Sequence, residues 1–320
     1  AKLVLDEPLR FRRRTRSNPC DFNEFIQALQ ASETIRNVEC CSHWRLGIAE
    51  DEWVLLLKTI GSIRDIHHLE IIINCDDSRD FHPFQAIAQA VNNAHTLNLL
   101  SVGLDGATLL RDPSGLTALA NALRKHTGLL EFNLIDRRSL LEAATRDLSP
   151  DLVLQALSAC PHLQQVTIIT KFASADAIRN LLQLPTDTDL RLALAPEQWL
   201  AVADEIRLGR CLIKELHLIL REISNSKATE AVKMIASAIR EDRHLELLVL
   251  GIEDGFTDEA GMAFAEALTI NKTLSMLILD DSLFASDYVD TKANLGAQAY
   301  DAFGTMLRVN TSIELNLPLP

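Results

Sequence analysis

Few side chains in this sequence have the types and spacing that catalysis or metal binding requires. His67 and His68 are adjacent, and so are Cys40 and Cys41. On a β-strand the two members of each pair point to opposite faces, so neither pair can easily bind one metal ion. The sequence contains no glycine-rich phosphate-binding motif and no nucleophile-elbow motif. It therefore predicts a protein that is not an enzyme and that holds no cofactor and no metal.

An oxygen-rich cation site is one alternative to this interpretation. Asp280 and Asp281 end a predicted strand, and Asp287 and Asp290 follow in the longest predicted loop. Carboxylates are suitable calcium ligands, but this spacing fits no known binding loop. The spacing favours a solvated acidic rim.

A repeated strand–helix pattern determines where all these side chains lie. The pattern leucine, two residues, leucine, one residue, leucine occurs at residues 245–250 and again at 274–279. Between the copies, an amphipathic run is expected to form a helix that begins after the N-cap residue Thr257 and stops at Asn271. A strand and a helix repeated about every 30 residues are typical of a solenoid.

A constant step of six residues, from the last buried helix position to the first strand position, sets the phase of the other units. The step recurs from Leu29 to Ile35, Ile60 to Ile66, Val91 to Leu97, Leu123 to Leu129, Leu157 to Leu163, Leu268 to Leu274 and Leu307 to Ile313. We expect about ten strand units, beginning at residues 35, 66, 97, 129, 163, 187, 213, 245, 274 and 313. The expected domains are a basic N-terminal arm over residues 1–20 and one repeat domain over residues 21–320.

The leucine pairs Leu248/Leu250 and Leu277/Leu279, with the Asn-x-Thr-Leu joint that begins at Asn271, resemble the ribonuclease-inhibitor-like leucine-rich-repeat family. The resemblance covers residues 21–320 and is strongest from residue 213 onward. It implies an α/β leucine-rich-repeat solenoid, a horseshoe with a concave parallel sheet and convex helices, and protein binding on the sheet. In this family the position after the strand is Asn or Cys, and these residues form a buried polar ladder that makes the turns uniform. Most units of this sequence have another residue there, so the ladder is mostly absent.

The third and fifth residues of each strand unit face away from the core, so these two columns are the predicted binding face. Toward the carboxyl end the columns are apolar. The members of this predicted patch are Leu247, Val249, Met276, Ile278, Leu315 and Leu317. Two interpretations are open: a docking site for a protein, or a surface that residues 283–292 or chain beyond Pro320 cover.

The remaining units carry acidic and polar residues in the same columns. The acidic members proposed for partner binding are Glu39, Glu70, Glu131 and Glu215, with Asn133 and Asp189 beside them. Such a face suits a basic partner and predicts salt-sensitive association, and the alternative is a solvated face.

Composition limits the classes of partner and compartment. A net charge of −13 argues against nucleic-acid binding, although Arg10 to Arg16 form a basic cluster. Six scattered cysteines argue against a disulfide scaffold and favour a cytoplasmic or other reducing intracellular compartment. No apolar run has the length of a membrane span.

The sequons at Asn271 and Asn310 stand at the same repeat position, which favours a structural role in a left-handed helix cap over glycosylation.

These observations predict a non-enzymatic scaffold that binds a protein partner on the sheet, chiefly at its apolar C-terminal part. One alternative is a regulator of an enzyme, such as a GTPase-activating leucine-rich-repeat protein, with Arg137, Arg138 or Arg221 acting on a bound nucleotide. Another is a structural subunit of a larger assembly. The sequence determines neither the identity of the partner nor the oligomeric state.

Overall fold

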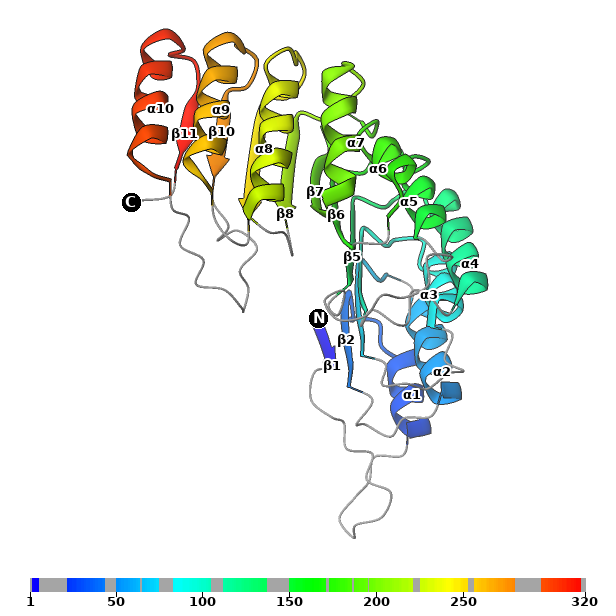
Figure 1. The fold of residues 1–320 in the computed structure, drawn as a ribbon. Helices are drawn as coiled ribbons and strands as arrows, with labels where there is room; N and C mark the ends of the chain where they lie inside the picture. The colour runs from blue at the N-terminus through cyan, green and yellow to red at the C-terminus, as the bar shows by residue number, and fades with distance from the viewer. Residues whose placement is uncertain are drawn as a thin grey trace. The chain divides into compact units, whose positions relative to one another are not determined.

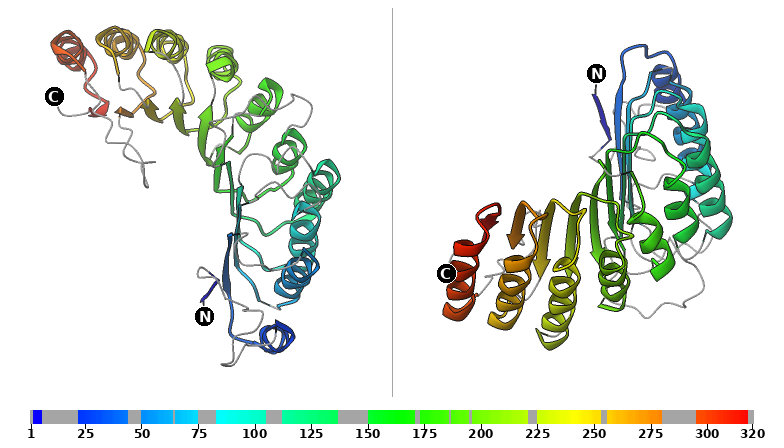
Figure 2. Two further views of the ribbon diagram at one scale, coloured as in Figure 1. Left: turned by 60° about the horizontal axis from the view of Figure 1, so that its bottom comes forward. Right: turned by 90° about the horizontal axis from the view of Figure 1, so that it is seen from above.

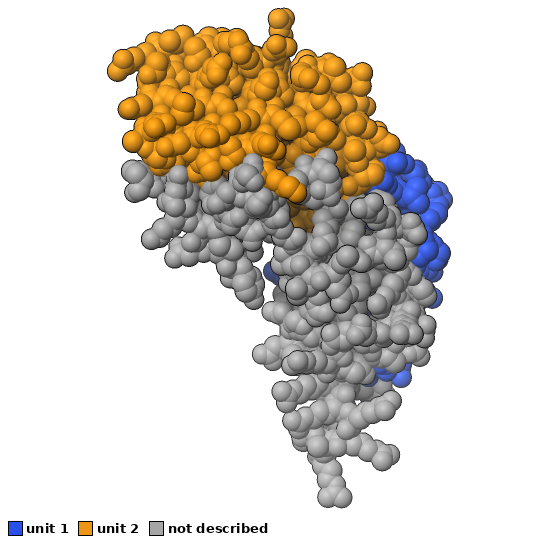
Figure 3. Space-filling view, viewed as in Figure 1, with its two compact units in different colours: residues 1–164 blue, residues 165–320 orange. Residues whose placement is uncertain are grey.

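The chain forms two compact units, residues 1–164 and residues 165–320, which Figure 3 shows in different colours. The structure is a computed structural model. It describes residues 2–5, 22–43, 50–63, 65–74, 83–104, 112–136, 150–170, 173–185, 187–194, 196–220, 225–252, 256–279 and 295–317. We call the two parts unit 1 and unit 2.

Unit 1 alternates strands and helices. Its elements are β1 (Lys2–Leu5), α1 (Phe22–Gln30), β2 (Asn37–His43), α2 (Glu50–Ser62), β3 (His68–Asn74), α3 (Pro83–Asn93), β4 (Leu99–Leu104), α4 (Pro113–Lys125), β5 (Glu131–Asp136) and α5 (Asp151–Leu157). The strands β1 to β5 pair in chain order and are all parallel. The helices α1 to α5 lie on one face of these strands (Figure 1).

Unit 2 repeats the same architecture. Its elements are β6 (Gln165–Ile169), α6 (Ala175–Leu181), β7 (Asp189–Leu194), α7 (Pro196–Arg207), β8 (Glu215–Leu220), α8 (Asn225–Ile239), β9 (Leu247–Ile252), α9 (Asp258–Ile270), β10 (Met276–Leu279), α10 (Ala297–Val309) and β11 (Glu314–Asn316). Strands β6 to β11 are parallel neighbours in chain order. The helices again line a single face (Figure 2).

The predicted fold class, an α/β leucine-rich-repeat solenoid, is confirmed by this alternation of parallel strands and helices. The predicted strand phase is confirmed by register in nine units. In unit 1 the third positions Asn37, His68, Leu99 and Glu131 lie in register. In unit 2 the same holds for Gln165, Asp189, Glu215, Leu247 and Met276. Leu248, Leu250, Leu277 and Leu279 are fully buried in one core, as expected.

The phase predicted for the last unit is wrong by one residue. Glu314 lies opposite Met276, and Leu315 lies opposite the core residue Leu277. The joint that follows Asn310 is one residue shorter than the joint that follows Asn271, so β11 enters the sheet one residue early. Because side chains alternate along a strand, this shift exchanges the two faces of the unit.

Strand β1 was not predicted, because Lys2–Leu5 falls within the expected basic arm. It pairs with β2 so that Val4 lies opposite Glu39. The Lys2 Nζ lies 2.5 Å from Glu39 Oε1. The arginine cluster of residues 10–16 lies outside the described residues.

Helix starts follow the expected capping chemistry. The Thr257 side chain accepts a hydrogen bond from the Ala260 main-chain nitrogen, as predicted for the N-cap of α9. At α4, Asp112 caps the helix by accepting from the Gly115 nitrogen at 2.8 Å. The Asp112 carboxylate also accepts from the Phe84 nitrogen at 3.1 Å, which ties the start of α3 to that of α4.

Buried side chains at the joints between helix and strand bind the main chain of the preceding unit. Asn271 donates from Nδ2 to the carbonyl oxygens of Ile239, at 2.7 Å, and Asp242, at 2.9 Å. Its Oδ1 accepts from the nitrogens of Thr273 and Leu274. Asn310 repeats this arrangement in the next unit. His126 stands at the same joint position and contacts the Ala94 carbonyl oxygen with its Nε2 at 3.0 Å.

The structural role expected for the two asparagines is therefore confirmed, but the prediction that they adopt the left-handed conformation is wrong. The φ and ψ angles are −66° and 132° at Asn271 and −117° and 97° at Asn310. Both residues have an extended main chain. Their side-chain amides bind carbonyl groups at the end of the helix in the preceding unit, so no left-handed residue is needed there.

Among the residues that the structure describes, none of the helices combines the length and the apolar character that a membrane crossing needs.

Candidate functional site

The outward columns lie on the face of each sheet opposite the helices. Parallel sheets in most α/β proteins carry helices on both faces. Here the helices of each unit line one face of its strands (Figure 2). The opposite face presents the third and fifth positions, and most of their side chains in the described strands are half-buried or exposed. The predicted binding columns therefore lie where a partner can reach them.

The apolar patch at the carboxyl end is smaller than predicted. Leu247, Met276 and Ile278 are half-buried, and Leu247 lies in register beside Met276. Val249 is 1% exposed, so its prediction as a docking residue is wrong. It stands in the fifth column, in register between His217 and Ile278, and Ser101 and Thr167 of that column are buried as well.

Leu315 and Leu317 were also wrongly placed in the patch. The register of β11 puts Glu314 beside Met276 and Asn316 beside Ile278, whereas Leu315 continues the row of Leu277. Leu317 alternates with Asn316 and so shares the side of Leu315. We therefore define the apolar patch as Leu247, Met276 and Ile278.

Acidic side chains flank the apolar patch on both sides. Across β8 to β11 the third column reads Glu215, Leu247, Met276 and Glu314. Both glutamates are exposed. With neighbouring strands about 4.8 Å apart, the two carboxylates stand about 14 Å from each other across the patch. We call this arrangement the flanked patch.

A polar cluster adjoins the flanked patch on β7 and β8. Arg191 donates to Asp189 Oδ2 from Nε at 3.0 Å and from Nη2 at 2.6 Å. The His217 Nε2 lies 3.3 Å from Asp189 Oδ1. Burial lowers the pKa of His217, an effect that the Asp189 carboxylate opposes and the Arg191 guanidinium strengthens. The charge of Asp189 is thus already compensated within the chain.

The acidic residues predicted in unit 1 occupy the outward face, with different surroundings. Glu39, Glu70 and Glu131 are all half-buried on β2, β3 and β5. Lys2 of β1 pairs with Glu39. Of these three acidic side chains in unit 1, Glu39 is therefore already paired with a lysine.

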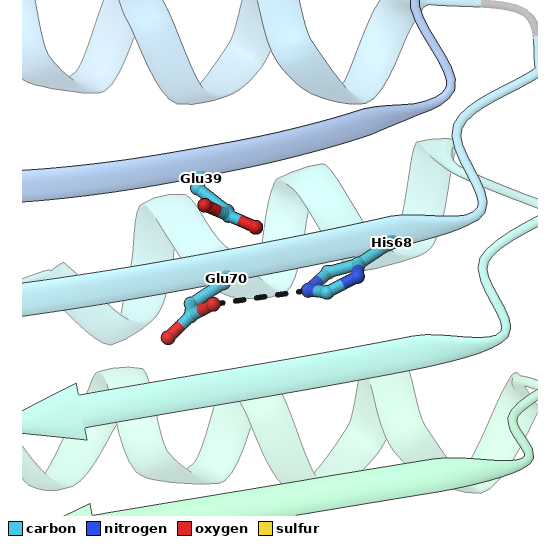
Figure 4. A group of neighbouring side chains, drawn as sticks. All are labelled: Glu39, His68 and Glu70. Carbon is cyan, nitrogen blue, oxygen red and sulfur yellow. Dashed lines mark ion pairs between the residues drawn. The ribbon is translucent and has the colours of Figure 1, made fainter. Parts of the chain in front are cut away.

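Three potential metal ligands meet on β2 and β3. Figure 4 shows Glu39, His68 and Glu70 on the same side of these strands, with the helices behind them. One ligand atom from each residue lies within 4.8 Å of the others. The sequence interpretation tested His68 only against the adjacent His67. It missed this cluster because the partners of His68 stand two residues along its own strand and on the neighbouring strand.

A third outward column was also missed. Strands β3 and β5 extend to a seventh position, where Ile72 and Ile135 flank Gly103 of β4 in register. A Cβ on Gly103 would lie 3.3 Å from Ile72 Cγ1, so the isoleucine side chain leans across the glycine. In unit 2 the same column holds Ile169 and Ile219. The signal was the run of β-branched residues that continues past the sixth position.

Two of the described cysteines are buried and are poor nucleophiles. Burial raises the pKa of Cys160 to about 11 and that of Cys211 to about 12, so both thiols stay protonated at neutral pH. Arg137, Arg138 and Arg221, which the regulator alternative requires, lie outside the described residues. So do Asp280, Asp281, Asp287 and Asp290 of the acidic loop.

Comparisons with known proteins found distant structural similarity and no sequence relative. No protein-family model matches the sequence, and no curated protein matches it. Among solved structures, the chain is similar to a chain in the crystal structure of the Rad7 and Elc1 complex in yeast. The two share 12% sequence identity over 92% of this chain and 72% of that chain, with a TM-score of 0.48. A likeness this distant leaves the function to be inferred from the site.

Proposed function

We propose that the protein is a non-enzymatic protein-interaction scaffold of the ribonuclease-inhibitor-like leucine-rich-repeat type. Its chief binding site is the flanked patch of unit 2. The observation that carries this proposal is the register of Glu215, Leu247, Met276 and Glu314, which sets half-buried apolar side chains between two exposed carboxylates. An apolar centre with a polar rim is the usual anatomy of a protein interface.

The chemistry of the flanked patch defines the partner. A matching segment needs one or two apolar anchors that cover Met276 and Ile278, and a Lys or Arg on each side that reaches Glu215 and Glu314. An extended segment of about five residues spans the distance of about 14 Å between the two carboxylates. The chain's net charge of −13 also attracts basic partners over long range and makes their association rate depend on salt.

The acidic residues of unit 1 provide a second contact surface in this proposal. Glu70 and Glu131 are half-buried on the open face of the sheet. Exposed charge pairs contribute little affinity each, so we assign these residues to partner orientation and association rate. The buried, protonated thiols of Cys160 and Cys211 suit a reducing compartment.

Selection from a library of random short peptides tests the proposal. The full chain, immobilised, is expected to enrich sequences with an apolar centre and a basic residue on either side. The double variant Glu215→Lys, Glu314→Lys is the matched selector, because it inverts the flanks and keeps the apolar centre. It should lose the preference for basic flanks. Enrichment of the same sequences by both proteins would contradict the proposal, and so would a preference of the unmodified chain for acidic flanks.

A further inference from the structure

The Glu39, His68 and Glu70 cluster of unit 1 combines one imidazole with two carboxylates. Glu39 stands on β2, and His68 and Glu70 stand at alternate positions of β3, so all three side chains share one face (Figure 4). The His68 Nε2 lies 3.9 Å from Glu70 Oε2. One ligand atom of each residue lies within 4.8 Å of the others.

The His68 Nε2 supports a role in binding a ligand. This atom is inaccessible to solvent and has no hydrogen-bond partner, although the side chain as a whole is 26% exposed. A ring nitrogen that is shielded from water and also unbonded loses hydrogen-bond energy unless another group occupies the space in front of it. The two carboxylates beside it make a cation the suitable occupant.

The Glu39 carboxylate already holds one cation. Lys2 Nζ lies 2.5 Å from its Oε1, and the lysine is carried by the short edge strand β1. The Lys2 side chain is 53% exposed and that of Glu39 is 20% exposed, so water screens the lysine side of this ion pair. The cluster therefore attracts positive charge, and a metal ion would compete with Lys2 for Glu39.

We infer that Glu39, His68 and Glu70 form a binding site for a divalent transition-metal ion of the zinc type. Nitrogen from imidazole together with carboxylate oxygen suits Zn²⁺ and its first-row neighbours, whereas Mg²⁺ and Ca²⁺ prefer all-oxygen sites. Zn²⁺ binds such ligands at about 2.0–2.2 Å, which sets neighbouring ligand atoms about 3.4 Å apart in a tetrahedron. Half-buried side chains can close from their present separation by rotation about their χ angles. The fourth position is left for water.

Metal titration of the chelator-treated full chain tests this site. Zn²⁺ affinity is measured by competition with a chromophoric chelator, and Co²⁺ absorption reports the ligand set. His68→Gln is expected to weaken Zn²⁺ binding by at least about tenfold, and Glu70→Gln should weaken it similarly, because each removes one of three ligands. His67→Gln is the matched control, since His67 is exposed just before β3 and is not a member of the cluster, and it should leave the affinity unchanged.

Two further experiments test the assignment of Glu39 and the class of metal ion. Lys2→Met removes the competing ammonium group and should tighten Zn²⁺ binding; an unchanged affinity would overturn the assignment of Glu39. Excess Mg²⁺ should leave bound Co²⁺ in place, and its displacement would overturn the transition-metal assignment. Equal Zn²⁺ affinity in the unmodified chain and in His68→Gln would overturn the site as a whole. Far-UV circular dichroism and urea unfolding of every variant verify that the fold is intact.

Discussion

Asn310 donates a hydrogen bond from its side-chain Nδ2 to the main-chain carbonyl oxygen of Asn271, 2.8 Å away, and Asn271 makes the equivalent bond to Asp242 at 2.9 Å. The three residues stand at the same joint of successive units and are all buried. The last two of these joints are thereby each tied to the preceding unit by a buried asparagine side chain.

Replacing Asn271 by Ala should lower the free energy of unfolding by about 2–4 kcal/mol. The substitution removes two donated and two accepted hydrogen bonds, and it leaves the Ile239 and Asp242 carbonyl groups buried without those donors. Urea unfolding measures the effect. Asn92→Ala, at an exposed position of α3, is the control and should be nearly neutral. Equal stabilities of the two variants would show that these hydrogen bonds do not stabilise the fold.

Val249→Thr should destabilise the chain by about 1–2 kcal/mol, because it places a hydroxyl group at a position that is 1% exposed. Valine and threonine have nearly the same shape, so the loss measures desolvation rather than packing. Val309→Thr makes the same change at a site that is 59% exposed, and it should have little effect. If Val249→Thr were as mild as Val309→Thr, Val249 would belong to the open surface after all.

The histidine of the polar cluster should make stability depend on pH. Burial lowers the pKa of His217 in the folded chain from its ordinary value of 6.5. Between the folded pKa and 6.5 the unfolded chain binds more protons, so the free energy of unfolding falls as the pH drops below 6.5. One such group gives a slope of at most about 1.4 kcal/mol per pH unit. Urea unfolding of the unmodified chain and of His217→Gln at several pH values isolates this contribution, which should be absent from the variant. Parallel curves would contradict the prediction.

Two helix glycines of unit 2 should respond in opposite directions to alanine. A Cβ on Gly261 of α9 would lie 2.7 Å from Ala299 Cβ of α10, so Gly261→Ala forces the two helices apart and should cost about 1–3 kcal/mol. A Cβ on Gly304 of α10 meets nothing within 4 Å. Gly304→Ala should therefore stabilise the chain by about 0.5–1 kcal/mol through helix propensity. Thermal unfolding compares them, and a loss of stability in Gly304→Ala would contradict the packing described for α10.

Local periodicity predicted most of the fold, because the strand phase depends on residues that are close in sequence. The six-residue step and the alternation of side chains placed Asn37, His68, Leu99 and Glu131 in their observed register. The prediction for the last unit was wrong because it counted Leu315 and Leu317 as outward positions from Ile313. The joint before the strand is one residue shorter than in the preceding unit, so these two leucines fall on the core side. Only the pairing of Glu314 with Met276 reveals this shift. Lys2–Leu5 was missed because four residues beside a cluster of arginines carry too little periodicity.

The site was less predictable than the fold, because it depends on neighbours that are distant in sequence. Val249 is buried although its column faces outward, and its neighbours His217 and Ile278 come from adjacent strands rather than from nearby in the sequence. The grouping of Glu39 with His68 follows from the pairing of β2 with β3. The sequence named both glutamates of that cluster as partner-binding residues but gave no reason to join them to a histidine.

The central claim, that the flanked patch binds a protein segment, is tested most directly by one pair of methionine substitutions. Met276→Glu places a charge in the half-buried apolar patch, whereas Met262→Glu places the same charge on α9 at a position that is 42% exposed. Fluorescence anisotropy with a labelled peptide, apolar at its centre and basic at both ends, gives the dissociation constants. The claim predicts at least about tenfold weaker binding for Met276→Glu and unchanged binding for Met262→Glu. Equal dissociation constants for the two variants would contradict it.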